Sequence, residues 1–268
     1  EKLSEIDVLF LALPHGMSEK LTKEAVENNV KVIDLGADFR LDDSTIYEKW
    51  YKVKHEFPNI NKSAIYGLPE IYKEEIRKSK IISSPGCYPT SAILGVAPLL
   101  KHNLVNTKKI VVDSKSGVSG AGRNAKVDLI FTEVNENFKA YNVLQHRHTP
   151  EIKQEMDKLC NSNINLVFTP HLLPINRGIL STIYLDVKEE LKEEISEEKI
   201  YKLYKEFYKN EHFVRITEDL PEIKNIKNSN ICEIGIRYDR EYGNIVVVSA
   251  IDNLIKGAGG QAVQSMNI

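Results

Sequence analysis

A cysteine placed between a strand and a helix most constrains what this chain folds into. Residues 80–83 have the pattern of a buried strand, Pro85, Gly86 and Cys87 follow it, and an apolar helical pattern runs over residues 90–100. Backbone N–H groups point outward at a helix N-terminus and favour negative charge, so this position stabilises the reactive thiolate of Cys87. The segment therefore predicts a nucleophile presented at the rim of a sheet. A small, inert, buried cysteine is the alternative interpretation.

Length and composition indicate a soluble globular protein with one large domain or two of ordinary size. The chain has 268 residues, of which 42% are apolar and 28% charged, and its net charge is -2. This charge gives no electrostatic reason to bind nucleic acid or an anionic membrane, so we expect neither as a partner. No apolar run is long enough to span a bilayer, and no leader pattern points to secretion.

The cysteines are Cys87, Cys160 and Cys232. They are odd in number, far apart and never in a C-x-x-C pair, so the sequence predicts neither a disulfide framework nor a cysteine-bound metal. A reducing cytoplasm is the simplest compartment for such a protein. Both ends of the chain look cut, because there is no initiator Met and the sequence stops without a polar tail.

Strand and helix patterns alternate over the first third of the chain. Strands are expected at residues 8–13, 30–35 and 80–83, and Ser18 is expected to cap a helix that ends near residue 28. This βαβ rhythm predicts an α/β fold with a parallel sheet and helical covers.

The rest of the chain has a different pattern. Its expected strands are separated by short turns and lie at residues 110–113, 166–168, 178–187, 232–238 and 245–250. Helices are expected to begin at Thr149 and after Ser196, and a last one covers about residues 253–264. Strands joined in this way favour an α+β second domain with a mostly antiparallel sheet. We assign residues 1–86 and 251–268 to the first domain and residues 87–250 to the second.

Two histidines and an arginine precede a helix in His146-Arg147-His148-Thr149-Pro150-Glu151. Histidine titrates near neutral pH, so either imidazole could give or take a proton. A solvated loop before the helix is an equally good interpretation of this segment taken alone. A metal site is a weaker option, because no further cluster has ligand spacing, and we expect no metal.

A loop rich in glycine and serine, residues 116–123, follows the strand at 110–113. Its backbone N–H groups could hold a phosphate or a carboxamide, and a flexible connection is the alternative. Arg40 and Arg177 are candidates for holding an anion, although isolated arginines are usually surface residues.

Taken together, these segments resemble the N-acetyl-gamma-glutamyl-phosphate reductase family, the NADP-dependent semialdehyde dehydrogenases of arginine biosynthesis. The strongest element, Pro85-Gly86-Cys87-Tyr88-Pro89-Thr90, is similar to that family's active-site signature. The supporting segments lie in the same order along nearly the whole chain, at residues 12–16, 34–40, 66–70, 119–123, 146–151, 169–172 and 253–257.

The resemblance implies a partial Rossmann-type parallel sheet and a second, catalytic and dimerisation domain. It implies NADP(H) as the cofactor, an acyl phosphate as the small-molecule substrate, and a homodimer or homotetramer formed through the second domain. The implied catalytic residues are Cys87, which forms a thioester, and His146 or His148, with His148 favoured as the acid/base. The implied substrate contacts are Arg40, Arg123, Glu151 and Arg177. The implied cofactor contacts are Pro14, His15, Ser84, Gly86, Ser119, Gly120, Asn253, Gly257 and Ala258.

The family begins with a strand, a glycine-rich loop and a helix that hold the cofactor pyrophosphate, and this sequence starts after that unit. We therefore expect a fragment of the family's full chain. The alternatives are a related aminoadipate or aspartate semialdehyde dehydrogenase, a cysteine acyltransferase or hydrolase, or an inactive fragment that only oligomerises.

Overall fold

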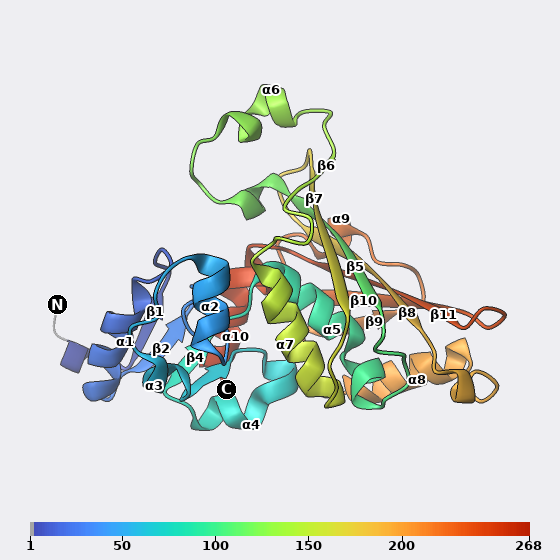
Figure 1. Cartoon of the computed structure of the whole chain (residues 1–268), viewed down its shortest axis with the longest axis horizontal. Coiled ribbons are helices and arrows are strands. Elements are labelled where there is room, and N and C mark those ends of the chain that lie inside the picture. The colour runs from blue at the N-terminus through green and yellow to red at the C-terminus, as the bar shows by residue number, and fades with distance from the viewer. Residues whose placement is uncertain (1–2) are drawn as a thin grey trace. The chain divides into compact units, whose positions relative to one another are not determined.

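The computed structural model describes residues 3–268, which form two compact units (Figure 1). The first unit runs to Gly86 and resumes at Ala258, and the second unit comprises Cys87–Gly257. The first boundary is the one expected from the sequence. The second differs, because residues 251–257, which we assigned to the first domain, belong to the second unit. There the last strand extends through Ile251, and the side chains after it bond to loops of the same unit.

The first unit contains a parallel sheet in the order β1-β2-β4-β3. Its strands are β1 (Val8–Leu11), β2 (Lys31–Asp34), β3 (Ala64–Tyr66) and β4 (Ile81–Ser83). Its helices are α1 (Ser18–Glu27), α2 (Ser44–Tyr51), α3 (Pro58–Asn61), α4 (Pro69–Lys78) and α10 (Gly260–Met266), with a 3-10 turn at Leu3–Glu5. Ile33, Ile76, Ile82 and Ala262 form a buried cluster that joins the sheet to α4 and α10. The predicted parallel α/β sheet is confirmed.

Ser18 does not cap α1, contrary to the expectation. The N-cap position is Met17, which makes no side-chain cap, and Ser18 is already helical. The Ser18 Oγ donates instead to Asp34 Oδ1 at the end of β2, and the Ser18 amide is taken by the carboxyl group of Asp38. A residue distant in sequence therefore satisfies the helix terminus.

The second unit contains a seven-stranded sheet in the order β6-β7-β5-β8-β11-β10-β9. The strands are β5 (Ile110–Gly117), β6 (Lys139–Ala140), β7 (Leu166–Leu173), β8 (Ile179–Asp186), β9 (Val214–Thr217), β10 (Cys232–Asp239) and β11 (Asn244–Ile251). The β5–β7 and β9–β10 pairs are parallel and the other four pairs are antiparallel, which confirms the mostly antiparallel prediction. The expected strand at 110–113 is longer than predicted and takes in the start of the glycine-rich segment.

The helices of the second unit are α5 (Cys87–Lys101), α6 (Phe131–Val134), α7 (His148–Cys160), α8 (Glu197–Phe207) and α9 (Ile223–Ile226). Shorter 3-10 turns lie at Val118–Ala121, Val127–Leu129 and Glu189–Leu191. Helix α5 packs on β8 and β11, with α7 and α8 beside it (Figure 1). The last predicted helix is divided, with a π-helical segment at Ile255–Gly259 before α10.

Two tyrosines, Tyr204 in α8 and Tyr208 directly after its end, donate hydrogen bonds to α5. Pro98 lies inside α5 and has no N–H, so the carbonyl of Leu94 lacks its helical partner. The hydroxyl of Tyr208 donates to that carbonyl at 2.7 Å, and Tyr204 donates to the carbonyl of Gly95 at 2.7 Å. These contacts give Tyr204 and Tyr208 a structural role.

We expect Tyr208→Phe to lower the free energy of unfolding by about 1–3 kcal/mol, because it leaves a buried carbonyl without a donor. Tyr201→Phe in α8 is the matched control, since the Tyr201 ring is partly exposed and packs against Lys205. Urea unfolding of both variants measures the difference. Equal stabilities would show that the Leu94 carbonyl does not depend on Tyr208.

Candidate active site

Cys87 is the first residue of α5 and follows Gly86 directly after the end of β4. Its side chain is partly exposed, and it forms no disulfide. Cys87 is therefore not fully enclosed, and its reactivity stays a prediction. The N-terminus of α5, a helix of 15 residues, favours negative charge on the sulfur.

Tyr88 joins the cysteine to the two histidines. Its ring lies edge-on to His146, with 5.4 Å between ring centroids, and to His148, with 6.0 Å between centroids. His148 is the first residue of α7, which packs along α5. The beginnings of the two helices therefore bring Cys87 and both predicted imidazoles into one region of the second unit.

His146 lies in a box of aromatic rings. The centroids of Tyr88, Tyr141 and Phe168 lie 5.4–5.5 Å from that of His146, and the ring of His148 is 4.8 Å away. The backbone N–H of His148 donates to His146 Nδ1 at 3.1 Å, so the proton of a neutral His146 is on Nε2.

Burial is the main cause that lowers the pKa of His146 to about 4, and the charge of Arg147 adds to it. His146 is consequently neutral at physiological pH. Because His146 Nδ1 accepts from the backbone N–H of His148 at the start of α7, His146 is placed to orient His148. This geometry favours His148 as the group that exchanges protons with a substrate, which stays a prediction.

Tyr141 is a site residue that the sequence analysis missed. Its hydroxyl lies 3.0 Å from the hydroxyl of Tyr88, which also donates to the backbone carbonyl of His171. Burial raises the pKa of Tyr141 to about 12, and the charge of the Cys87 thiolate acts in the same direction. Burial likewise raises the pKa of Tyr88. No local pattern distinguishes Tyr141, because only the pairing of β6 with β7 brings it close.

Asn253 holds the predicted glycine-rich loop in place. Its Oδ1 accepts from the backbone N–H of Gly178 at 2.8 Å, and its Nδ2 donates to Ser119 Oγ at 3.0 Å. Ser119 Oγ donates in turn to the carbonyl of Asn176 at 2.6 Å. A Cβ added at Gly120 would lie 2.8 Å from Ser116 Oγ. The loop is therefore ordered at its start, and the cofactor contacts of Ser119, Gly120 and Asn253 stay predictions.

The predicted substrate residues of the second unit differ in what they contact. The Arg177 guanidinium bonds to Asn228 Oδ1 at 2.6 Å and lies 3.7 Å from the buried carboxyl of Asp252, which favours a structural role. Glu151 is fully buried in the first turn of α7, a position where a helix terminus favours negative charge. Arg123 is exposed beside the loop and has the access that an anion requires. Substrate binding by these three residues stays a prediction.

Arg40 links the ends of two strands in the first unit. Its Nε donates to the carbonyl of Ser84 at 2.8 Å and its Nη2 to the carbonyl of Leu35 at 2.7 Å. The side chain is only 8% exposed. Arg40 thus has a structural role, as a hydrogen-bond donor to two backbone carbonyls, that the sequence did not predict. Phosphate binding by Arg40 stays a prediction.

Pro14, His15, Ser84 and Gly86 follow the carboxyl ends of the parallel strands β1 and β4. Ligands of open parallel sheets bind at this edge. The hydroxyl groups of Ser83 and Ser84 are buried there without a hydrogen-bond partner in the structure. Buried hydroxyls without partners fit a polar ligand such as the carboxamide or ribose of a dinucleotide.

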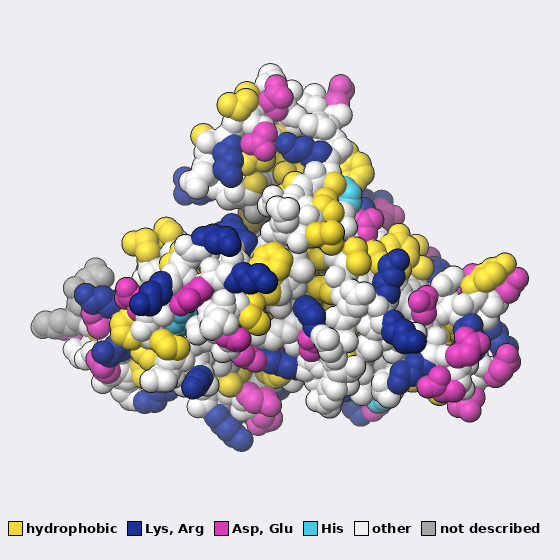
Figure 2. All heavy atoms as spheres, in the orientation of Figure 1, with side chains coloured by type: hydrophobic (Ala, Val, Ile, Leu, Met, Phe, Trp, Pro, Cys, Tyr) yellow, Lys and Arg dark blue, Asp and Glu magenta, His cyan; other side chains and the backbone are white. Residues whose placement is uncertain are grey.

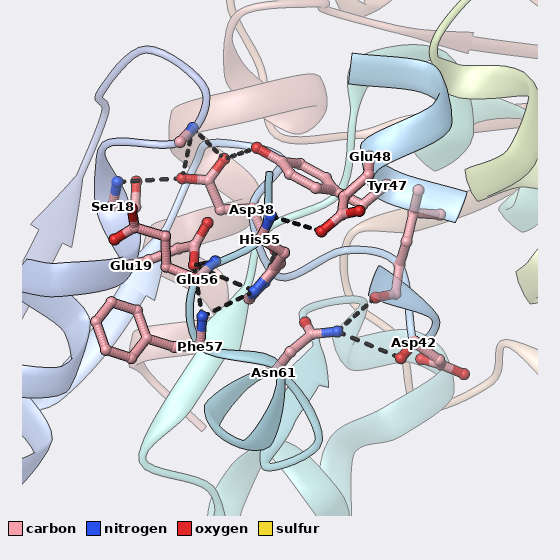
Figure 3. A network of polar contacts seen from close by, with 12 residues as sticks. Ser18, Glu19, Asp38, Asp42, Tyr47, Glu48, His55, Glu56, Phe57 and Asn61 are labelled. Carbon is pink, nitrogen blue, oxygen red and sulfur yellow. Dashed lines mark hydrogen bonds and ion pairs between the residues drawn. The ribbon is translucent and has the colours of Figure 1, made fainter. Parts of the chain in front are cut away.

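A buried polar network fixes the turn that carries His15 (Figure 3). The carboxyl group of Asp38 accepts from the backbone N–H groups of Gly16 and Ser18 at 2.9–3.1 Å and from the hydroxyl of Tyr47 at 2.7 Å. His55 Nε2 donates to the backbone carbonyl of Asp38 at 2.9 Å. The loop after β2 thereby orders the loop after β1.

His55 also contacts a buried carboxyl group. Its Nδ1 lies 3.1 Å from Glu19 Oε2, which accepts from the backbone N–H groups of Glu56 and Phe57. Burial is the main cause that raises the pKa of Glu19. His55 therefore connects Glu19 on α1 to the backbone of the loop after β2.

We expect Asp38→Ala to destabilise the protein by about 2–4 kcal/mol, because two amides and one hydroxyl lose a buried acceptor. The same change should weaken binding of a nicotinamide dinucleotide, since Gly16 belongs to the turn at the strand edge. Asp7→Ala is the control, because Asp7 is exposed in the same unit. Chemical unfolding and cofactor titration measure the two effects. If Asp38→Ala lost stability but kept its affinity for the dinucleotide, the turn that contains Gly16 would not be part of the cofactor site.

Within residues 3–268, no group of histidine, cysteine, aspartate and glutamate side chains is arranged to hold a metal ion. Over the same described part of the chain, no helix is both long and apolar enough to cross a bilayer.

Comparison with known proteins assigns the family. Residues 87–253 match the family described as semialdehyde dehydrogenase, dimerisation domain. The chain belongs to the semialdehyde dehydrogenase family. Residues 1–79 of this semialdehyde dehydrogenase match the NAD binding domain of the same family. The first unit is therefore a nicotinamide dinucleotide-binding domain and the second a dimerisation domain.

Curated relatives confirm the resemblance noted in the sequence. The N-acetyl-gamma-glutamyl-phosphate reductase of Pelotomaculum thermopropionicum is 52% identical over 270 residues, covering 100% of this chain and 77% of the relative. The enzyme of the same name from Clostridium novyi is 48% identical, covering 100% of this chain and 76% of the relative. Aspartate semialdehyde dehydrogenase II from Vibrio cholerae shares the fold, with a TM-score of 0.74 at 19% identity, over 100% of this chain and 80% of that one.

Proposed function

We propose that this semialdehyde dehydrogenase reduces N-acetyl-gamma-glutamyl phosphate to N-acetylglutamate 5-semialdehyde and inorganic phosphate, with NADPH as the reductant. The observation that carries the proposal is Cys87, partly exposed at the start of α5, with His146 and His148 grouped around its neighbour Tyr88. The names of the curated relatives support the substrate.

The first half of the reaction is acyl transfer. The Cys87 thiolate attacks the gamma-carbonyl carbon, the bond from that carbon to the phosphate oxygen breaks, and phosphate leaves with the electron pair. A thioester on Cys87 remains. The N–H groups at the start of α5 stabilise both the thiolate and the oxyanion that forms on attack.

The second half releases the semialdehyde. The nicotinamide, when bound, would supply a hydride to the thioester carbon. Protonated His148 gives a proton to the negatively charged oxygen on that carbon, which leaves a hemithioacetal on Cys87. His148 takes the same proton back as the carbon–sulfur bond breaks, the carbonyl of the semialdehyde forms and the sulfur leaves as thiolate. His146 stays neutral and holds the His148 amide throughout.

The cofactor contacts that we propose in the first unit are Pro14, His15, Ser84, Gly86 and Ala258. The second unit carries its own proposed contacts at Ser119, Gly120, Asn253 and Gly257. The buried hydroxyl of Ser84 is the polar group best suited to a carboxamide. The choice of NADPH over NADH is part of the proposal.

The test is the absorbance of reduced nicotinamide after addition of the acyl phosphate. We expect oxidation of NADPH with stoichiometric release of phosphate, and slower oxidation of NADH. Release of phosphate without oxidation of either cofactor would instead support a cysteine hydrolase or acyltransferase. The free thiols of Cys87, Cys160 and Cys232 fit a reducing compartment, and we propose the cytoplasm.

We propose further that the protein forms a homodimer or homotetramer through its second unit. An arm comprising residues 122–145, which includes α6 and β6, carries exposed apolar side chains (Figures 1 and 2). Phe131 is 78% exposed, Val127 77% and Leu144 61%. Large exposed apolar side chains gathered in one segment are typical of interaction surfaces. The match to a dimerisation domain supports a second copy of this chain as the partner.

We expect Phe131→Ser to shift sedimentation velocity toward smaller species and to raise the dimer dissociation constant about tenfold or more. Tyr242→Ser is the matched control, because Tyr242 is 66% exposed at the β10–β11 turn, outside the arm. An unchanged distribution for the Phe131 variant would exclude the arm from the interface.

A further inference from the structure

Gly257, at the end of the second unit, lies against Cys87, at its start. A Cβ atom added at Gly257 would lie 2.8 Å from Cys87 Cβ and 3.2 Å from Cys87 Cα. Non-bonded carbon atoms at optimal contact lie about 3.5–4.0 Å apart, so a side chain at position 257 would have to displace the cysteine or the segment itself. Only glycine fits against Cys87 in this arrangement.

The other side of Gly257 is also closed. The same added Cβ would lie 3.3 Å from Cδ1 of Ile251, which is fully buried at the end of β11. Gly257 is thus confined between β11, an inner strand of the sheet, and the first residue of α5. A side chain added at position 257 would therefore push against Cys87, because Ile251 closes the opposite side.

A π-helical segment holds Gly257 in this position. The N–H of Gly257 donates to the carbonyl of Asp252 at 3.0 Å, five residues back in the chain. Such short π-helical segments are rare and frequently occur at functional sites.

The carboxyl group of Asp252 fixes the start of that segment. It is fully buried, and its Oδ1 accepts from the N–H groups of Leu254 and Ile255 at 2.9 and 3.1 Å. Its Oδ2 accepts from the N–H of Asn228 at 2.8 Å and lies 3.7 Å from Arg177 Nη1. The turn is therefore tied to two other loops of the second unit.

We propose that Gly257, held by the buried carboxyl group of Asp252, is a positioning residue that sets the place of the Cys87 thiol at the start of α5. This inference rests on the proposed function only in taking Cys87 as the nucleophile. Moving Cys87 Cβ moves the sulfur away from the helix N–H groups, which raises the thiol pKa and misplaces the attacking atom.

The test is alkylation of the Cys87 thiol by iodoacetamide over a range of pH, followed by peptide mass spectrometry. For Gly257→Ala we expect the pH of half-maximal alkylation to rise by about one unit and the rate at neutral pH to fall about tenfold. An unchanged pH midpoint and rate in a folded Gly257→Ala protein would overturn the proposal. The readout needs neither acyl phosphate nor cofactor, so it stands even if the proposed reduction is not observed.

Two controls separate positioning from general damage. Cys160 lies at the far end of α7, and its alkylation in the same sample should not change. Leu254→Ala removes an exposed side chain from the turn directly before that segment, and it should leave the Cys87 midpoint unchanged. In turnover assays at saturating cofactor, Gly257→Ala should lower kcat about 10–100-fold with little change in KM for the acyl phosphate.

A second variant tests the steric cause. Ile251→Val removes the Cδ1 atom that closes the other side of Gly257, so the double variant with Gly257→Ala should recover part of the lost reactivity of Cys87. If Gly257→Ala acted only by destabilising the fold, a second large-to-small core change would worsen the defect. The double variant also carries the test should the single variant fail to fold.

Discussion

Cys87→Ser is expected to abolish reduction of the acyl phosphate, with kcat/KM lowered by about 10³-fold or more. A serine hydroxyl keeps nearly the volume of the thiol and the same contact with Gly257, but it is not ionised at neutral pH at the start of α5. The fold should therefore survive while the nucleophile is lost. Steady-state oxidation of NADPH measures the effect.

Cys160→Ser and Cys232→Ser are the matched controls for that variant. Cys160 Sγ contacts the carbonyl of Met156, and Cys232 is buried on β10 against Ser249. Neither lies among the residues grouped around Tyr88, so both variants should keep wild-type rates. A Cys87→Ser enzyme that still turned over near the wild-type rate would refute the thioester.

His148→Asn is expected to lower kcat by about 10²–10⁴-fold and to remove one limb of the pH–rate profile. An imidazole that moves the hemithioacetal proton has no substitute in an amide side chain. His146→Asn should keep both limbs, because His146 acts through the amide of His148 and the asparagine oxygen can accept from the same N–H. The reverse pattern in the two profiles would make His146 the acid/base.

The same histidine predicts a dependence of stability on pH. Because burial lowers the pKa of His146 from 6.5 to about 4, the folded state takes up its proton later than the unfolded state. Its contribution is fully present above pH 6.5 and is lost as the pH falls toward 4, by at most about 3 kcal/mol. His146→Asn should flatten this part of the curve of unfolding free energy against pH.

Asp34 acts in the opposite direction over nearly the same range. Its burial raises its pKa from 3.8 to about 6, so protonation of Asp34 stabilises the folded state as the pH falls below 6. The wild-type curve therefore combines opposing contributions, and Glu19, whose pKa burial also raises, acts in the same direction as Asp34. Only the difference between wild type and His146→Asn isolates the histidine, and an identical slope in both proteins would contradict the lowered pKa.

The sequence was most informative where the chemistry is local. Cys87 lies between a strand and a helix as its flanking patterns predicted, and Ser196 caps α8 by accepting from the N–H of Lys199. Parallel and antiparallel sheets were separable because the connections between strands differ in length. The prediction that Ser18 caps α1 was wrong, because the carboxyl group of Asp38, distant in sequence, accepts from the Ser18 N–H at the start of that helix.

The site itself was only partly predictable. The sequence pointed to the motif around Cys87 and to the His146–His148 segment. It could not tell which histidine exchanges protons, because that depends on the aromatic rings packed around His146. Two of those rings, Tyr141 near the end of the arm and Phe168 on β7, are far from each other in the sequence, so no local pattern predicts that they meet. Arg40 and Arg177 show the same limit, since their buried partners belong to distant loops.

The contact between the two ends of the second unit has a consequence for engineering the chain. Cys87 and Gly257 bound one uninterrupted segment of the sequence, and an atom added at Gly257 would lie 3.2 Å from the Cys87 backbone. Modules whose ends meet in this way tolerate insertion into a host and circular permutation. Residues 87–257 thus form a cassette that could be exchanged between homologues, or closed on itself by a short linker with new termini opened in the arm.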